Sequence, residues 1–326
     1  MRTTVLSAGA ALALGLAGCA GVTPFPRQLV PSADRAGSHG PPYAVGERVI
    51  TFVDRSRTVT FPGQAPQPRT LVTVVRYPAQ GPPGAMDIRN ATPDRAAGPF
   101  PLVIFGHGFA VTPATYYRLL RAWAQAGYVV AAPVFPLENA NAPGGPNESD
   151  LVNQPRDMSF VISGMLAASA SPHARLAGMI DPSGIAVSGQ SDGGETALAV
   201  AYDRYYRDRR VRAAIILSGA EIPSVASLAF GAGAPPLLAA QGTADVINLP
   251  RNTYAFFHIA HRPKFLLELT GAPHLPPYTS EQPQLGIVES VTVAFLDRYL
   301  NGERAGITDM KRAGDRPGTA LLVARP

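Results

Sequence analysis

Gly189-Gln190-Ser191-Asp192-Gly193-Gly194 is the stretch that decides the fold of this chain. It follows Gly184 to Ser188, an apolar run typical of a buried strand, and precedes Glu195 to Tyr202, a run of good helix formers. A G-x-S-x-G pattern between a strand and a helix predicts a sharp turn that lifts the serine hydroxyl above a sheet. Ser191 is therefore a candidate nucleophile. The helix that follows would point its N-terminus at the same place, where its dipole favours negative charge.

On both sides of this turn, short apolar runs alternate with helix-like segments, a pattern that predicts βαβ units and a parallel sheet. The expected strands are Val49–Val53, Leu71–Tyr77, Pro101–Phe105, Tyr128–Ala132, Gly184–Ser188, Val211–Leu217, Pro236–Gln241 and Lys264–Leu269. The expected helices are Thr112–Gly127, Pro155–Ala170, Glu195–Tyr202, Arg251–Ala260 and Leu285–Leu300. The predicted fold class is α/β: a mostly parallel sheet of eight or nine strands with helices on both faces.

Three further regions complete this prediction. The first two strands are β-branched and partly alternating, which indicates an antiparallel opening pair. The loop Pro133–Asn153 is long for a compact domain, and such loops are often functional. The segment between Leu217 and Pro236 leaves no room for a large lid, and the weakly patterned residues 301–326 are expected to form a surface segment.

The amino-terminal residues resemble an export signal. Arg2 precedes Val5–Leu16, an apolar run too short to span a membrane as a stable helix, and Leu16-Ala17-Gly18-Cys19 resembles a bacterial lipobox. The resemblance implies cleavage before Cys19, lipidation of its thiol and an exported, membrane-anchored protein. An ordinary signal peptide cut nearby, giving a secreted protein, is the alternative. The expected organisation is a signal peptide (1–18), a Pro/Gly-rich tether (19–42) and an α/β-hydrolase catalytic domain (43–326).

The composition is that of a globular, slightly basic protein. Of 326 residues, 46% are hydrophobic and 16% charged, and 28 basic against 23 acidic residues give a formal charge of +5. The densest basic run, Arg204–Arg212, is interleaved with tyrosines; a solvated helix end explains it better than a nucleic-acid patch, so no nucleic-acid partner is expected. Cys19 is the only cysteine, which excludes an intrachain disulfide.

A serine hydroxyl needs a base to accept its proton, and the base needs a carboxylate to hold its tautomer. His274 follows the expected strand Lys264–Leu269, and Asp245 follows the strand that ends at Gln241. Both therefore belong to loops at the carboxyl ends of parallel strands, the edge that also carries Ser191. The order Ser191, Asp245, His274 is the one expected of α/β-hydrolases. Asp245 could alternatively cap the helix that begins near Leu249-Pro250.

An oxyanion hole requires two backbone N–H groups aimed at one point. One should come from Asp192, the residue after the nucleophile. The other should come from the loop after Phe105, and we assign it to Phe109, whose side chain would also line the acyl pocket. His107 lies in this loop too, and we expect it to order the loop by hydrogen bonding rather than to act as a base.

From about Tyr43 to Leu300 the chain resembles a serine esterase of the α/β-hydrolase superfamily. It is similar to the group that spans bacterial cutinase-like polyesterases, secreted platelet-activating-factor acetylhydrolases, chlorophyllases and dienelactone-hydrolase-like enzymes. The stretches that carry the resemblance are Arg69–Pro78, Phe100–Phe109, Asn153–Asp157, Gly189–Gly194, Gly242–Asp245 and Gly271–His274. It implies a triad of Ser191, Asp245 and His274, oxyanion amides from Phe109 and Asp192, and no metal or organic cofactor. Gln190 and Asp192 depart from the His or Trp and the Met that polyesterases usually carry there.

The expected function is thus that of an exported serine carboxylesterase that acts on a small-molecule or lipid-like ester through an acyl-enzyme on Ser191. Polyesterase, lipase-type or phospholipid acetylhydrolase activity remains open. A serine peptidase of the prolyl-oligopeptidase type shares the triad, and a catalytically silent binding module shares the scaffold. No obligate protein partner is evident.

Overall fold

The computed structural model describes residues 42–231 and 233–326. The predicted signal peptide, Cys19 and nearly all of the predicted tether lie outside these residues. Within them, no helix is long and apolar enough to cross a membrane.

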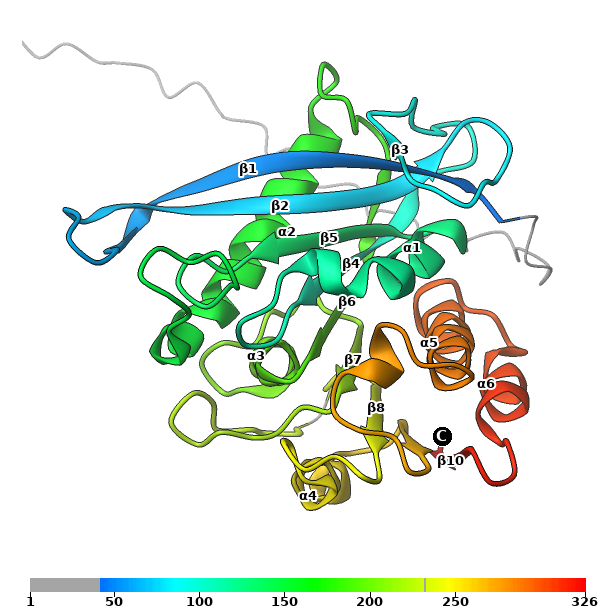
Figure 1. Cartoon of the computed structure of the whole chain (residues 1–326). Helices are drawn as coiled ribbons and strands as arrows, with labels where there is room; N and C mark the ends of the chain where they lie inside the picture. The colour runs from blue at the N-terminus through cyan, green and yellow to red at the C-terminus, as the bar shows by residue number, and fades with distance from the viewer. Residues whose placement is uncertain (1–41, 232) are drawn as a thin grey trace, which may run out of the picture. The chain divides into compact units, whose positions relative to one another are not determined.

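The described residues form one ten-stranded sheet flanked by helices (Figure 1). The strands are β1 Ala44–Val59, β2 Gln67–Ala79, β3 Ile88–Arg89, β4 Phe100–Gly106, β5 Val129–Val134, β6 Ile180–Gln190, β7 Ala213–Leu217, β8 Leu237–Gly242, β9 Lys264–Leu269 and β10 Ala320–Arg325. The α-helices are α1 Tyr117–Gln125, α2 Gln154–Ala170, α3 Asp192–Tyr202, α4 Pro250–Ile259, α5 Gln284–Leu300 and α6 Gly306–Gly314, and short 3₁₀ turns are η1 Pro113–Tyr116, η2 Glu148–Asn153 and η3 Pro276–Tyr278.

The strand order is β10-β9-β8-β7-β6-β4-β5-β2-β1-β3. The block from β9 to β5 is parallel throughout, whereas the pairs β10–β9, β5–β2 and β2–β1 are antiparallel and the short β3 pairs parallel with β1. β4, β7 and β8 are buried along their whole length, as expected of continuously apolar strands in the middle of a parallel sheet. The predicted α/β class is confirmed.

Helices cover both faces of the sheet, as predicted. On one face, α2, α3 and α4 contribute side chains such as Met158, Leu198 and Phe256 to a core with the inward residues of the strands. On the other, α1, α5 and α6 pack through residues such as Trp123 and Phe295. Figure 1 shows these two groups of helices on either side of the strands. The two cores hold the sheet rigidly between them.

Three sequence predictions are corrected here. The opening pair is antiparallel, but β1 and β2 are far longer than the predicted Val49–Val53 and Leu71–Tyr77, since the ladder continues through polar residues past a register shift between Asp54 and Thr58. Residues 301–326 are not a mere surface segment, because they form α6 and β10, and β10 pairs with β9. Their pattern is weak because α6 is only nine residues long and the apolar run of β10 only five. With β3 and β10, the sheet has ten strands rather than eight or nine.

The parallel block gives the sheet two distinct edges. We call the edge where β4 to β9 begin the amino edge, and the edge where they end the carboxyl edge. The loops after β4, β6, β8 and β9, which contain all the predicted site residues, therefore meet at the carboxyl edge. Ligands of open α/β sheets bind at this edge.

Candidate active site

Ser191 lies on a strained turn between β6 and α3. Its backbone has φ 55° and ψ −125°, a left-handed conformation that residues with a side chain rarely adopt. The turn is held by a hydrogen bond from Ser191 N to Leu217 O (3.0 Å) and by one from Gly194 N to Ser191 O (2.7 Å). A Cβ at Gly189 would overlap the Gly193 carbonyl, so only glycine permits this close approach of strand and helix.

Asp245 and His274 lie on the loops that follow the neighbouring strands β8 and β9. The two loops are tied together by a hydrogen bond from Ala244 N to Ala272 O (3.1 Å). The Nδ1 atom of His274 lies 2.7 Å from Oδ2 of Asp245. The other carboxylate oxygen of Asp245 accepts the backbone N–H groups of Ile247 and Asn248, both at 2.9 Å. This makes Asp245 a fixed acceptor for the imidazole.

The environment keeps Asp245 ionised. Burial acts to raise its pKa, but the hydrogen bond and charge of His274, together with the two backbone amides, outweigh burial and hold the pKa below its ordinary value. An ionised Asp245 places the proton of a neutral His274 on Nδ1, which leaves the Nε2 lone pair able to accept a proton. The alternative in which Asp245 caps α4 does not hold, because the N-cap of α4 is Leu249.

Gln190 joins His274 to the strand that carries Ser191. Its Nε2 lies 3.2 Å from Nε2 of His274 and donates to the His274 carbonyl at 3.1 Å. The Ser191 hydroxyl itself makes no hydrogen bond to the described residues. The structure thus brings Ser191, Asp245 and His274 to one edge, with Asp245 joined directly to His274 and Ser191 linked to it through the adjacent glutamine.

The loop after β4 packs against the turn of Ser191. A Cβ added at Gly108 would lie 3.1 Å from Cβ of Ser191, so only a small residue permits this approach. Gly108 N donates to the Tyr116 hydroxyl (3.2 Å) and Ala110 N to the Glu138 carbonyl (3.0 Å). Between them, the Phe109 amide has no acceptor among the described residues. Asp192 is the first residue of α3, so its amide is one of those that have no partner within the helix. Both predicted oxyanion donors lie beside Ser191.

His107 is a structural residue of this loop, as predicted. It is fully buried, its Nδ1 lies 2.8 Å from Gly108 O, and its Nε2 accepts the Phe135 N–H at 3.1 Å. Burial lowers its pKa to about 4, so the ring is neutral at physiological pH. Its full burial keeps the ring away from any substrate, which argues against His107 as the base.

Two buried carboxyl groups near Ser191 were not singled out from the sequence as parts of the site. Glu138 is fully buried in the loop after β5, and the carboxyl of Asp192 is the group that acts most strongly on it. Burial first, and then Asp192, raise the pKa of Glu138 to about 11, and burial and Asp192 raise that of Glu195 to about 9. Both are neutral at pH 7, so neither carboxyl group adds negative charge beside Ser191.

The sequence also did not point to the contacts of Gln190. Its position directly before Ser191 was the available signal, but only the fold shows which side chain it reaches.

Within the described part of the chain, no group of three or more His, Cys, Asp or Glu residues is arranged to hold a metal ion.

Comparison with known proteins supports the α/β fold of the chain and its likeness to esterases. The sequence profile of the chlorophyllase family matches residues 63–219, a little under half of the chain. Among curated proteins, no sequence matches the chain significantly. Among solved structures, the ferulic acid esterase of Streptomyces cinnamoneus superimposes with a TM-score of 0.64 over 86% of this chain and 96% of that one, at 22% sequence identity. At that identity, the likeness is one of fold.

Proposed function

Because this chain has the α/β-hydrolase fold and resembles the chlorophyllase family over residues 63–219, we propose that it is a serine carboxylic-ester hydrolase. One observation carries the proposal. An Asp245–His274 hydrogen bond of 2.7 Å lies at the same sheet edge as Ser191, whose strained turn presents its hydroxyl. That combination is what activates a seryl nucleophile.

The geometry supports a two-step reaction. Nε2 of His274 takes the proton of the Ser191 hydroxyl as Oγ attacks the ester carbonyl, and Asp245 stabilises the resulting imidazolium. The Phe109 and Asp192 amides bind the carbonyl oxygen as it becomes negative. The tetrahedral adduct then expels the alcohol, which leaves with the proton from His274. Water attacks the acyl-enzyme by the same route, and this releases the acid and restores Ser191.

The side chains around this edge favour an apolar, uncharged ester. Phe109, Val246 and Ile247 lie next to the oxyanion and triad residues, and they are 43%, 82% and 71% exposed. Exposed apolar side chains at a site mark contacts with apolar ligands. The chlorophyllase family and the ferulic acid esterase are both named for ester hydrolysis, which supports the reaction class. A suitable panel is p-nitrophenyl esters of increasing chain length together with a feruloyl ester.

Replacing Ser191 tests the mechanism. Ser191→Ala should lower kcat for short p-nitrophenyl esters by roughly 10⁴-fold or more and abolish labelling by a fluorophosphonate. Ser188→Ala is the matched control, because its buried hydroxyl has no hydrogen-bond partner in the described structure and takes no part in the reaction. A Ser191→Ala protein as active as the parent would show that another group is the nucleophile.

We propose further that the chain is exported and lipid-anchored through Cys19. Support comes from the lipobox-like Leu16-Ala17-Gly18-Cys19 and the apolar run before it. The mature protein should then begin at Cys19 and carry acyl chains, a mass difference that Cys19→Ala removes. A mature chain that starts elsewhere, without added mass, would favour secretion instead.

A further inference from the structure

The connecting loops at the two edges of the parallel sheet differ in the sign of their charged residues. At the amino edge, the segment before β7 contains the five arginines of residues 204–212, and Arg95, Arg175 and Arg262 stand in the segments before β4, β6 and β9. At the carboxyl edge, the connecting loops contain Asp and Glu but no Lys or Arg. These loops are residues 107–116, 135–153, 218–228, 243–249 and 270–283.

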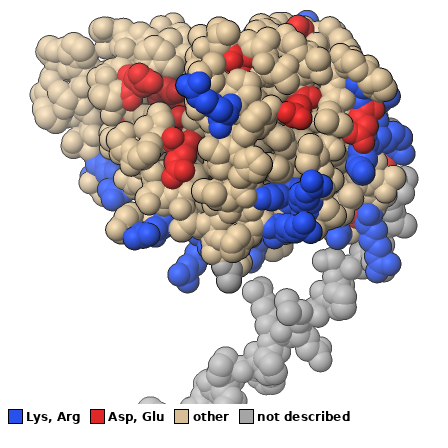
Figure 2. Space-filling view, turned by 90° about the horizontal axis from the view of Figure 1, so that it is seen from below, with Lys and Arg blue, Asp and Glu red and all other residues tan. Residues whose placement is uncertain are grey.

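The amino edge also contains four acidic residues, Asp94, Asp181, Asp203 and Asp208, which offset only part of its charge. Asp203 accepts the backbone N–H groups of Tyr205, Tyr206 and Ser227, and Asp208 pairs with Arg210. Figure 2, which views the end of the sheet near α4 and β10, shows that basic side chains gather in one part of this face and acidic ones in another. The proposed catalytic residues lie at the carboxyl edge, opposite these basic residues.

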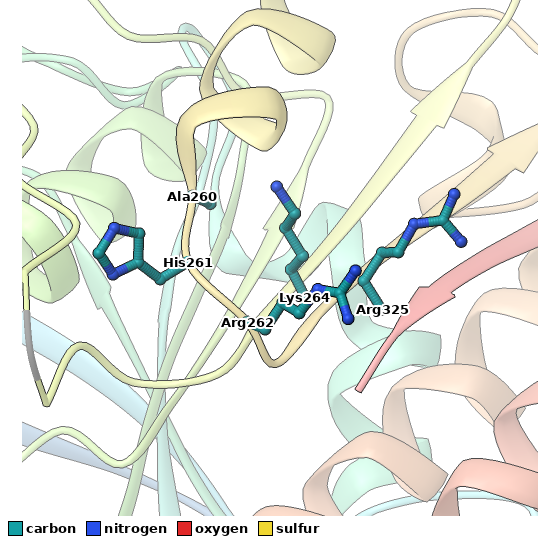
Figure 3. Close-up of a pocket in the computed structure, with 5 residues that line it drawn as sticks. All are labelled: Ala260, His261, Arg262, Lys264 and Arg325. Atoms are coloured by element: carbon teal, nitrogen blue, oxygen red, sulfur yellow. The ribbon is translucent and has the colours of Figure 1, made fainter.

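A basic pocket lies at the β9–β10 end of the amino edge. We use this name for a cavity of about 570 Å³ lined by Ala260, His261, Arg262, Lys264 and Arg325. In Figure 3 the Arg262, Lys264 and Arg325 side chains lie side by side, whereas His261 turns to the other side of its loop. Lys264 and Arg325 are direct partners in the antiparallel ladder of β9 and β10. Like charges placed opposite each other in this way are destabilising.

Among the described residues, no carboxylate pairs with the three cations of the basic pocket. Lys264 Nζ donates to the carbonyls of Phe257 (2.8 Å) and His258 (2.9 Å), at the last turn of α4, and keeps one donor free. Burial and the nearby charges of Arg262 and Arg325 lower the pKa of Lys264, which reflects how close the three cations lie. An oxyanion in the basic pocket would remove this repulsion.

We propose that the amino edge docks on an anionic phospholipid membrane, with a lipid phosphate in the basic pocket and the carboxyl edge facing away from the bilayer. A membrane fits better than a small anion because the arginines that have no carboxylate partner among the described residues are spread over several segments along one edge instead of converging on a single point. The described chain also enters the domain at this edge, where Tyr43 packs on Phe100, the first residue of β4, with ring centroids 5.4 Å apart. A membrane anchor upstream of Tyr43 would hold this same edge toward the lipid.

Binding to vesicles tests the proposal independently of ester hydrolysis. The whole chain carrying Cys19→Ala, which cannot be lipidated at that thiol, is mixed with phosphatidylcholine vesicles with or without phosphatidylglycerol. We expect binding that depends on phosphatidylglycerol and weakens as salt rises. The double variant Arg262→Gln/Arg325→Gln should lose roughly tenfold or more of this binding, since each basic residue near an anionic surface contributes about fivefold.

The matched control is Arg118→Gln/Arg251→Gln, which removes the same charge from two exposed arginines in helices that begin at the carboxyl edge. It should change binding by no more than about twofold, because these charges face away from the lipid. Hydrolysis of a soluble ester should be unchanged in both double variants, so failure of the proposed function and failure of this proposal can be told apart.

Three outcomes would overturn the proposal: equal loss of binding in the two double variants, saturation by inorganic phosphate with no preference for phosphatidylglycerol vesicles, or tighter binding to a DNA oligonucleotide than to the vesicles.

Discussion

Gln190 connects the two halves of the proposed catalytic machinery. Its Oε1 accepts the Tyr116 hydroxyl proton at 2.7 Å, and Tyr116 in turn accepts the N–H of Gly108 in the oxyanion loop. Its Nε2 contacts the ring and the carbonyl of His274. Both Gln190 and Tyr116 are buried, so this chain of hydrogen bonds is shielded from water. We therefore infer that Gln190 positions both His274 and the loop after β4, which contains Gly108 and Phe109.

Replacing Gln190 by Met, which has a similar shape but no N–H donor, should lower kcat by roughly 10- to 100-fold and leave KM nearly unchanged. The reason is that His274 would lose its alignment with Ser191, whereas substrate does not reach the buried position 190. Steady-state kinetics on a soluble ester measure both constants.

The matched control for this substitution is Gln154→Met. Gln154 is also a fully buried glutamine, but its side chain accepts from Thr196 and does not reach His274. It should keep the parent kcat. Tyr116→Phe should have a smaller effect than Gln190→Met, because the direct contact with His274 remains. An unchanged kcat in Gln190→Met would show that His274 is held by Asp245 alone.

At the scale of elements, a buried ion-pair cluster fastens the long loop after β5 to β2. Arg69 of β2 is 1% exposed and forms two hydrogen bonds with Asp157 of α2, at 2.7 and 2.6 Å. It forms two more with Asp150 of η2, at 2.9 and 2.6 Å. The same loop carries Glu138 and so reaches the oxyanion residues. The cluster thus fixes the end of the loop after β5 that leads into α2, while Glu138 in the same loop contacts the loop after β4 near Ser191.

Arg69→Met should lower the free energy of unfolding by about 3–5 kcal/mol, because it leaves the buried Asp150 without its counterion and leaves Asp157 with Arg57 alone. Urea unfolding measures the change. Adding Asp150→Asn and Asp157→Asn should recover part of the loss, since neutral amides remove the uncompensated charge. The control Arg312→Met breaks a pair with Asp309 in which the arginine is 73% exposed, and it should cost less than about 1 kcal/mol. Equal stability of the parent and Arg69→Met would show that the cluster does not hold the loop.

For the molecule as a whole, the buried carboxyl groups tie stability to pH. The unfolded chain releases the Glu195 proton near the ordinary pKa of 4.5, whereas burial raises the pKa of the folded protein to about 9. Between these values unfolding releases a proton, so stability is greatest below the lower pKa and falls as pH rises toward the higher one. Glu138 acts in the same direction.

Glu195→Gln should therefore be more stable than the parent at alkaline pH and should show a weaker decline between about pH 5 and pH 9. For one such group the parent slope is at most about 1.4 kcal/mol per pH unit. Thermal or urea unfolding over this range provides the measurement. Glu303→Gln, in the partly exposed turn before α6, is the matched control and should keep the parent slope. Parallel curves for Glu195→Gln and the parent would mean that Glu195 is ionised in the folded protein.

Sequence reasoning located most elements of the sheet and the residues of the proposed triad, but it missed what depends on weak or distant patterns. The buried strands were found because β4, β7 and β8 are continuously apolar. The element β10 was missed because its apolar run is only five residues long, and two helices, α5 and α6, separate it in the chain from its partner β9. The neutral state of the Glu138 and Glu195 carboxyl groups could not be foreseen. Burial is the largest cause of their raised pKa values, and burial is known only from the fold.

The sequence by itself determined the local features: the strand, sharp turn and helix around Ser191, and the loops at strand ends that carry Asp245 and His274. These depend on glycines, prolines and apolar runs within a few residues, and the order of parallel strands then brings their ends to one edge. Only the tertiary structure decided that Gln190 contacts His274, that Arg69 holds Asp150 and Asp157, and that basic residues from separate segments share the opposite edge. Such contacts join residues far apart in the chain, and packing, which no local pattern encodes, selects them.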